Sequence, residues 1–270
     1  MVWMGMAIYG IGRYIEELRR IILIILFFLA FNGCSSPMDG PRVIYLDGAG
    51  WYSGDGPVRN GLQRAGFAGP VERFGWQSLL GPLHDHLTAG EHHPKVMELS
   101  RRISKLRKAN PEGRLILIGF SAGTSIIVSA LEELPTDVKV DYVVLLSPSV
   151  SSKHNLSKAL RHVKYRLYAT HSSHDSLLTV VASAGLERGH PAGQTGFIVP
   201  SDLTDYERDL YGKVVNLPWR PGYAAYGWDG GHVSVTSSDF ICVVVAPRIL
   251  EELPHPLDRP ITARGTAGYE

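Results

Sequence analysis

Short apolar runs alternate with amphipathic stretches along most of this chain of 270 residues. Apolar spacing of three and four residues predicts helices over 57–68 and 94–109. Strand patterns occur at 42–46, 71–75, 115–118, 138–146 and 164–170, with shorter candidates at 197–199 and 214–217. This alternation predicts an α/β fold: a mostly parallel central sheet with helices on both faces. Such sheets bind ligands at the carboxyl ends of their strands.

The strand pattern at 115–118 runs directly into Gly119-Phe-Ser-Ala-Gly123, and an apolar helical pattern follows at once. In this strand–turn–helix context G-x-S-x-G is typical of a nucleophilic serine, held in strained backbone geometry with its hydroxyl above the sheet edge. Glycines flank it because a Cβ would collide with the neighbouring strand or helix. The helix N-terminus favours a developing oxyanion. The alternative is an ordinary turn with a chance serine.

A serine hydroxyl needs an adjacent base, and the base needs an orienting acid. Downstream of Ser121, Asp175 follows the strand pattern at 164–170, and His232 lies in a glycine-rich loop at 226–235. Each falls where a parallel sheet would gather site residues. The order serine, acid, histidine therefore predicts a catalytic triad.

Other residues of the same types lie nearby in the chain. Asp229 is an alternative acid, although it lies only three residues before His232. His171 and His174 are alternative bases, but they share the loop of Asp175 and leave little room for a third group. Asp175 and His232 could also be ordinary cap and turn residues.

Between residues 43 and 250 the chain resembles the α/β-hydrolases, which carry this motif and this order of triad residues. The resemblance implies that Ser121 attacks a carbonyl while His232 moves the proton and Asp175 orients the imidazole. It also implies an oxyanion hole, for which we expect the N–H group of Ala122 and a second N–H from Gly48 or Ala49. The activity implied is hydrolysis of a carboxylic ester or thioester.

Aromatic residues gather near the expected strand ends, which favours an apolar substrate pocket. The candidates for its wall are Trp51, Tyr52 and Trp228, although core packing would use the same residues. We expect a small-molecule ester or lipid-like substrate.

The composition, 44% hydrophobic and 20% charged with a net charge of +1, is that of a globular protein with a real core. A nearly neutral chain gives no reason to expect nucleic acid as a partner. The eleven histidines show no convincing metal spacing, so we expect no metal and no organic cofactor.

The N-terminal segment resembles a secretory signal peptide, with arginines before an apolar run of 21–31. We expect a signal segment over 1–33, and Gly33-Cys34 resembles the lipidation site of bacterial lipoproteins, with a tether over 34–41. These features predict export to the cell envelope with a lipid anchor at Cys34. Plain secretion and an uncleaved anchor are the alternatives. The other cysteine, Cys242, lies in an apolar run and is interpreted as a core residue.

A hydrolase domain over 42–252 follows. Within it, 187–221 is irregular and is interpreted as a cap or a surface excursion. Residues 236–250 predict a last helix despite Pro247, and 253–270 a loosely held tail. The preferred function is an exported serine hydrolase. A non-catalytic cell-envelope binding protein and a serine peptidase are the alternatives.

Overall fold

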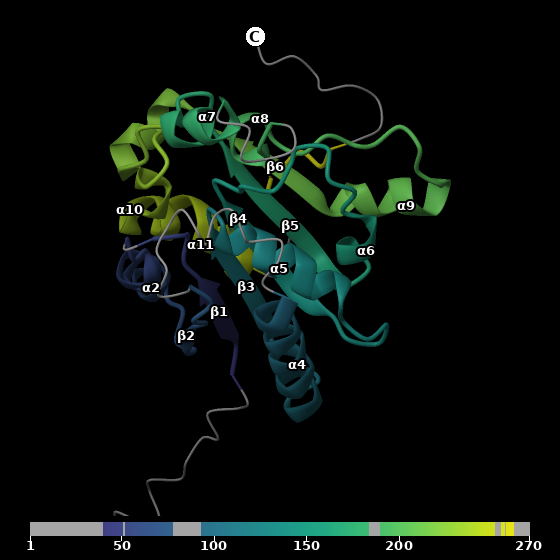
Figure 1. The fold of residues 1–270 in the computed structure, drawn as a ribbon. Helices are drawn as coiled ribbons and strands as arrows, with labels where there is room; N and C mark the ends of the chain where they lie inside the picture. The colour runs from purple at the N-terminus through teal and green to yellow at the C-terminus, as the bar shows by residue number, and fades with distance from the viewer. Residues whose placement is uncertain are drawn as a thin grey trace, which may run out of the picture. The chain divides into compact units, whose positions relative to one another are not determined.

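The computed structural model of this protein describes residues 40–50, 52–77, 93–183, 190–251, 255–256 and 258–261. Its strands are β1 (Arg42–Leu46), β2 (Val71–Arg73), β3 (Leu115–Phe120), β4 (Val140–Leu146), β5 (Val163–His171) and β6 (Val214–Pro218). They form one sheet in the order β2-β1-β3-β4-β5-β6, and all five pairings are parallel (Figure 1). The predicted α/β fold class is confirmed.

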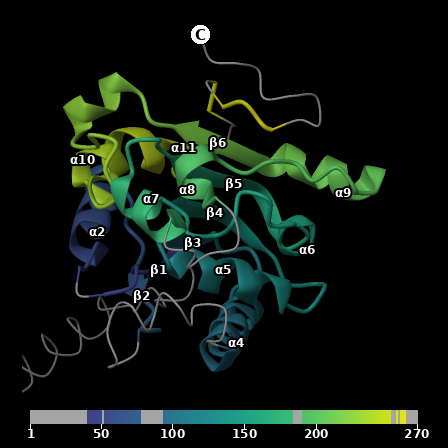
Figure 2. The same cartoon turned by 45° about the horizontal axis from the view of Figure 1, so that its top comes forward.

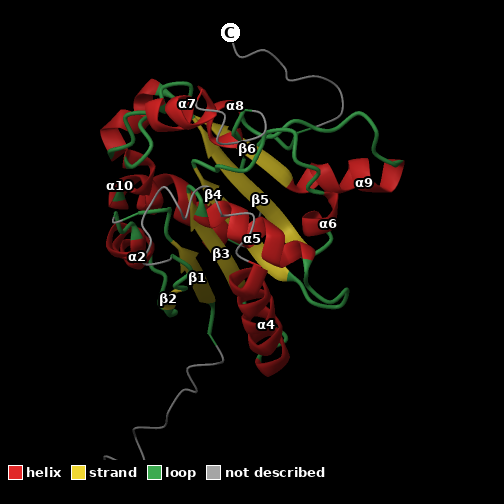
Figure 3. Cartoon of the chain, viewed as in Figure 1, coloured by secondary structure: helices red, strands yellow, loops and turns green. Residues whose placement is uncertain are grey.

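Helices lie on both faces of the sheet (Figure 3). The longer ones are α2 (Asp55–Arg64), α4 (His93–Ala109), α5 (Gly123–Glu132) and α7 (Ser176–Ser183). The shorter ones are α6 (Ser157–Leu160), α8 (Ala192–Thr195), α9 (Asp205–Leu210), α10 (Ser238–Phe240) and α11 (Ala246–Leu250). Single turns complete them: η1 (Tyr211–Lys213), η2 (Pro221–Tyr226), η3 (Ser234–Thr236) and the π-helical η4 (Ile241–Val245).

The sheet separates two apolar layers. On one face α4, α5 and α6 pack on alternate strand residues such as Leu117 and Val143. On the other face α2 and the run from α10 to α11 pack on the intervening residues, such as Ile116 and Val144. Because successive side chains of a strand point to opposite faces, continuously apolar strands are what a sheet covered on both sides requires.

The chain reverses its direction across the sheet between β1 and β3. From β1 it passes to β2 on one side, and from β3 it proceeds through β4 and β5 to β6 on the other. In parallel sheets the crevice beyond such a switch point is the usual ligand position. Helices α7 and α8 lie at the end of the sheet where β5 finishes (Figures 1 and 2). The topology therefore predicts a site at the carboxyl ends of β1 and β3.

Several sequence predictions need correction. No strand forms at 197–199. The main chain of Phe197 is instead bonded to the Asn216 side chain, with Phe197 N donating to Oδ1 and Nδ2 donating to the Phe197 carbonyl. The segment 187–221 is not simply a cap, since it contains β6, an edge strand of the sheet. Its residues 187–189 lie outside the described residues.

The last helical segment follows the prediction only in part. Ser237 precedes it without a side-chain cap bond. The π-helical turn η4 comes just before Pro247, whose ring lacks an N–H and crowds the preceding turn. The side chain of Arg248 donates to the Val244 carbonyl within this irregular stretch.

Part of the tail expected to be loose is docked. Asp258 forms a buried ion pair with Arg248 (Nε–Oδ1 3.0 Å) and accepts from Tyr168. Pro260 forms an antiparallel bridge with Val215, and Ile261 N donates to the Val214 carbonyl. Residues 258–261 therefore cover the exposed edge of β6. The signal segment, Cys34 and the rest of the tether up to residue 39 lie outside the described residues.

Candidate active site

Ser121 occupies a tight turn between β3 and α5. Its φ is +50°, a left-handed conformation that is uncommon for a residue with a side chain. The turn is fixed by its main chain, since Ser121 N donates to the Leu146 carbonyl of β4 and Thr124 N donates to the Ser121 carbonyl. The strained serine that the motif predicted is therefore present, held at the carboxyl end of the sheet.

The two motif glycines have the steric role expected of them. A Cβ on Gly123 would lie 2.4 Å from the Asp47 carbonyl oxygen, and one on Gly119 would lie 2.8 Å from Ile127 Cδ1. Real Cβ atoms essentially never come so close, so β1, β3 and α5 meet here only because both residues lack a side chain.

A continuous chain of hydrogen bonds joins the three predicted triad residues. Ser121 Oγ lies 2.8 Å from His232 Nε2, and His232 Nδ1 lies 2.7 Å from Asp175 Oδ2. Asp175 is fully buried, and its other oxygen accepts from Leu178 N at the start of α7. This is the geometry in which a histidine takes a serine proton and a carboxylate holds the imidazole.

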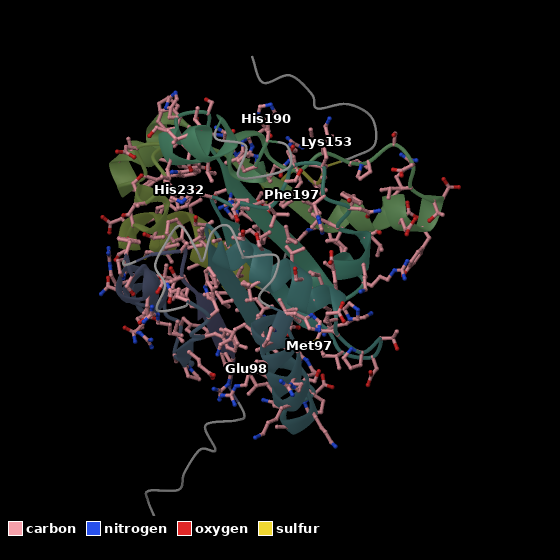
Figure 4. All side chains as sticks on the ribbon, in the orientation of Figure 1. Met97, Glu98, Lys153, His190, Phe197 and His232 are labelled. Carbon is pink, nitrogen blue, oxygen red and sulfur yellow. The ribbon has the colours of Figure 1, made fainter. Side chains whose placement is uncertain are left out.

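His232, labelled in Figure 4, lies in a loop that is held by its own contacts. Gly227 and Gly230 adopt positive φ values of +82° and +94°, so the loop can turn sharply on either side of Trp228. Trp228 Nε1 donates to the Gly231 carbonyl, next to the histidine. The Phe120 ring packs against the imidazole, with ring centroids 5.0 Å apart. The histidine is thus positioned before any substrate binds.

The candidate oxyanion donors lie beside the serine. Ala122 begins the α5 turn, and its N–H has no hydrogen-bond partner among the described residues. Gly48 approaches closely from the end of β1, since a Cβ there would lie 2.9 Å from Ser121 Cβ. Ala49 follows it and is partly buried. The structure therefore brings together Ser121 and the three residues expected to supply N–H groups.

The three aromatic residues expected to line a pocket differ in their burial and position. Tyr52 is partly exposed and lies next to the site, packed edge-on against Phe120 with its hydroxyl 2.6 Å from Thr236 Oγ1. The prediction that Trp228 lines a pocket is wrong, because this residue is fully buried between Tyr223 and Phe240 and belongs to the core. Its size favours burial once an apolar layer lies behind the loop. Trp51 lies outside the described residues.

The alternative acid does not join the triad. Asp229 accepts from Ser234 Oγ and from Gly231 N, within its own loop. These hydrogen bonds, that of Ser234 first, lower the pKa of the Asp229 carboxyl. Its role is to brace the loop that carries His232.

The alternative bases are not hydrogen-bonded to Ser121 either. Burial lowers the pKa of His171 to about 4, which makes its ring a weak proton acceptor. His174 packs against Trp219, with ring centroids 4.5 Å apart. Both lie in or beside the loop of Asp175 rather than opposite the serine.

Sequence reasoning missed two residues at this edge of the sheet. Asp47, directly after β1, is fully buried, accepts three hydrogen bonds and pairs with Arg73, in a cluster that no short motif signals. Ser147, directly after β4, has a φ of +44°. Its hydroxyl is the one buried side-chain polar atom of the described residues without a hydrogen-bond partner.

The described part of the chain holds no cluster of three or more histidine, cysteine, aspartate or glutamate side chains suited to a metal ion. Within the same residues, none of the helices has both the length and the apolar character to span a membrane. Cys242 is a free thiol in η4 and is only partly buried, so the interpretation as a core residue holds only in part.

No protein-family model matches the chain, and no curated protein matches it. Among solved structures, an esterase of Pyrococcus furiosus is 16% identical with a TM-score of 0.42, over 73% of this chain and 77% of that one. A cutinase-like protein from Cryptococcus sp. is 17% identical with a TM-score of 0.40, over 77% and 91%. A Trichoderma reesei cutinase is 19% identical with a TM-score of 0.35, over 44% of this chain and 57% of the cutinase.

These likenesses are distant. The chain itself combines a parallel sheet, a serine in a strand–turn–helix turn, and an acid and a histidine that follow it in that order along the chain.

Proposed function

We propose that this protein is a serine hydrolase that cleaves a carboxylic ester through an acyl-enzyme. The observation that carries the proposal is the hydrogen-bonded chain from Ser121 Oγ through His232 to the buried Asp175 carboxylate. A serine in an ordinary turn would not need a left-handed φ, a neighbouring imidazole and a fully buried carboxylate behind it.

In the first half of the reaction Ser121 Oγ bonds to the substrate carbonyl carbon, and its proton passes to His232 Nε2. The imidazolium then gives this proton to the departing alkoxide, which leaves as the alcohol. In the second half a water attacks the acyl-enzyme, its proton passes through His232, and the acid is released with Ser121 restored. Asp175 keeps Nδ1 protonated and stabilises the charged ring in both halves.

The negative charge on the carbonyl oxygen needs donors that are already in place. The Ala122 N–H, at the N-terminal end of the ten-residue helix α5, supplies one. An N–H of Gly48 or Ala49 supplies the other, from the strand end that touches Ser121. One such donor is worth about 3 kcal/mol of transition-state stabilisation.

The surroundings of the triad favour a substrate with an apolar part. Tyr52, Leu177 and Val233 are large apolar side chains that are 38%, 50% and 41% exposed. Along the chain Leu177 lies two residues after Asp175, and Val233 directly follows His232. We propose a small-molecule or lipid-like ester as substrate, with thioester and peptide bonds as variants of the same chemistry.

Labelling with a fluorophosphonate probe tests the nucleophile. We expect one probe per molecule, with the modified peptide containing Ser121, and no labelling of Ser121→Ala. Ser173→Ala, a change in the loop before Asp175, is the control and should label as wild type does. An unlabelled wild-type protein would favour the non-catalytic binding protein instead.

A panel of chromogenic substrates distinguishes ester hydrolysis from thioester and peptide hydrolysis. We expect turnover of acyl esters, graded by acyl length, with slower turnover of a matched anilide. Turnover of peptides in preference to esters would identify a peptidase and contradict the ester assignment.

The N-terminal sequence supports a further part of the proposal, export with a lipid anchor at Cys34. Mass spectrometry of the mature protein should find Cys34 as a modified N-terminal residue. An intact Met1 on protein from the cytoplasm would overturn export. An unmodified N-terminus near residue 34 would retain export and remove the anchor.

A further inference from the structure

Asp47 is a fully buried carboxylate with four polar partners, although it is not part of the proposed triad. Its Oδ1 accepts from Tyr45 Oη at 2.8 Å and from Gly54 N at 2.7 Å. Its Oδ2 accepts from Ser53 Oγ at 3.1 Å and forms an ion pair with Arg73, with Nε at 2.9 Å. A fully buried carboxylate is costly unless paired and hydrogen-bonded in this way.

These bonds join the two ends of the loop that follows β1. Asp47 is its first residue, while Ser53 and Gly54 are its last residues before α2. Burial, and then the charge of the Asp47 carboxylate, raise the pKa of Tyr45, so its phenol stays protonated and donates. Arg73 at the end of β2 supplies the balancing positive charge and is 45% exposed. One carboxylate therefore closes the loop and fastens it to the neighbouring strand.

The segment after β2 also holds the main chain of this loop. Trp76 Nε1 donates to the Asp47 carbonyl, and Gln77 Nε2 donates to the Gly48 carbonyl, both at 2.8 Å. Arg73 in turn donates to the Gln77 side chain. The same arginine thus supports the loop twice, directly through Asp47 and indirectly through Gln77.

The hydrogen bonds to the Asp47 and Gly48 carbonyls also fix the directions of the Gly48 and Ala49 N–H groups, the candidate oxyanion donors. In a trans peptide the C=O and the following N–H point in opposite directions. The Asp47 carbonyl therefore sets the direction of the Gly48 N–H, and the Gly48 carbonyl sets that of the Ala49 N–H. Among the described residues neither N–H has a hydrogen-bond partner. Gly48 lies close to Ser121, since a Cβ on Gly48 would come within 2.9 Å of Ser121 Cβ.

We propose that Asp47, held by Arg73, is a positioning residue that sets the second oxyanion donor, the N–H of Gly48 or Ala49, against Ser121. The inference rests on the proposed esterase function for its chemical consequence. Asp47 does not touch the substrate; it acts through the loop that it closes. Such a residue supports the transition state more than it supports substrate binding, because the oxyanion forms only during reaction.

The test compares Asp47→Asn and Arg73→Met with wild type on one chromogenic ester. We expect kcat to fall about 100-fold in Asp47→Asn and about 10-fold in Arg73→Met, with KM within about threefold of wild type. Arg73→Lys should recover part of the loss, because an ammonium restores the charge beside Asp47 without the second bond to Gln77.

Arg161→Met is the matched control. Arg161 is 49% exposed, pairs with the Glu207 carboxylate and precedes β5, at the opposite end of the strands from the triad. We expect kcat and KM of this variant to equal those of wild type. If kcat of Arg161→Met falls as much as that of Arg73→Met, then losing any half-exposed, ion-paired arginine lowers kcat, and the inference is overturned.

A second measurement does not depend on turnover. Backbone ¹⁵N relaxation should show Gly48 and Ala49 ordered in wild type and more mobile in Arg73→Met, while Ala122 is unchanged. Unchanged order together with unchanged kcat overturns the inference, as does a raised KM with kcat retained or a lowered melting temperature alone. If Gly48 and Ala49 are ordered in wild type but the protein hydrolyses no ester, the proposed function is refuted. The ¹⁵N relaxation of Arg73→Met still tests whether Arg73 holds the loop.

Discussion

The turns after β3 and β4 lie side by side and begin alike, yet only the first carries a serine that is hydrogen-bonded to a histidine. Phe120 and Leu146 are paired in the sheet, and each is followed by a buried serine with left-handed φ, +50° at Ser121 and +44° at Ser147. Ser121 Oγ bonds to His232, whereas Ser147 Oγ has no partner. Backbone strain alone therefore does not make a nucleophile.

The difference arises from the path of the chain after each serine. Beyond Ser121 the chain enters α5 at once, which requires Gly119 and Gly123 and places a helix N-terminus at the reacting centre. Beyond Ser147 it continues through Pro148 without a helix until Ser157. No glycine is needed two residues to either side of Ser147, where Leu145 and Ser149 stand.

The largest expected effect separates the two serines by activity. Ser121→Ala should lower kcat on a chromogenic ester by about 10⁴-fold or more, because the nucleophile is lost. Ser147→Ala should leave kcat within about threefold, because its hydroxyl binds no group of the triad. Initial rates, with circular dichroism to verify folding, measure both. Equal losses in the two variants would mean that Ser147 also takes part in the reaction.

The second prediction concerns the glycines that distinguish the turns. Gly123→Ala should destabilise the protein by about 3 kcal/mol, since the new Cβ would meet the Asp47 carbonyl at 2.4 Å. Ser149→Ala, at the equivalent place after Ser147, should cost about 1 kcal/mol through its lost hydrogen bonds to Ser125 and to the Ser121 carbonyl. Urea unfolding of the two variants gives both values. A smaller loss for Gly123→Ala than for Ser149→Ala would contradict the steric explanation.

The third prediction concerns how each turn is anchored. Ser121 N donates to a backbone carbonyl, but Ser147 N donates to the Thr170 hydroxyl at 2.8 Å. Thr170→Val should therefore leave a buried N–H unpaired and lower the free energy of unfolding by about 2 kcal/mol. Thr170→Ser keeps the hydroxyl and should lose less. Denaturant titration of both variants decides, and a loss for Thr170→Val no larger than that for Thr170→Ser would contradict the anchoring role of the hydroxyl.

The smallest expected effect is a gain in stability. Ser147→Gly removes an unpartnered hydroxyl and the strain of a positive φ, against the entropy that glycine loses on folding. We expect a net gain of about 1 kcal/mol, or roughly 2–4 °C in melting temperature. Ser147→Ala, which keeps the strain, should gain less. A melting temperature below wild type for both variants would show that the Ser147 hydroxyl has a stabilising partner.

Sequence alone suffices for the parts of this protein that depend on near neighbours in the chain. The turn at Ser121 could be predicted because strand, glycines and helix are contiguous, and the steric demand on Gly119 and Gly123 is local. Continuous apolar strands could likewise be read as a sheet covered on both faces. The pairing of Asp175 with His232 could be predicted from their order, since the ends of parallel strands meet at one edge.

Contacts between residues far apart in the chain are set only by the folded protein. Asp47 gains its partners from Tyr45, the end of the loop and Arg73 on another strand, and no spacing reveals that convergence. Trp228 is as aromatic as Tyr52, but the apolar layer behind its loop buries it. Residues 258–261 dock because Asp258 meets Arg248 beside the open edge of β6 and Ile261 packs against the core. Composition shows what a side chain prefers, whereas only the packed fold decides which partners it finds.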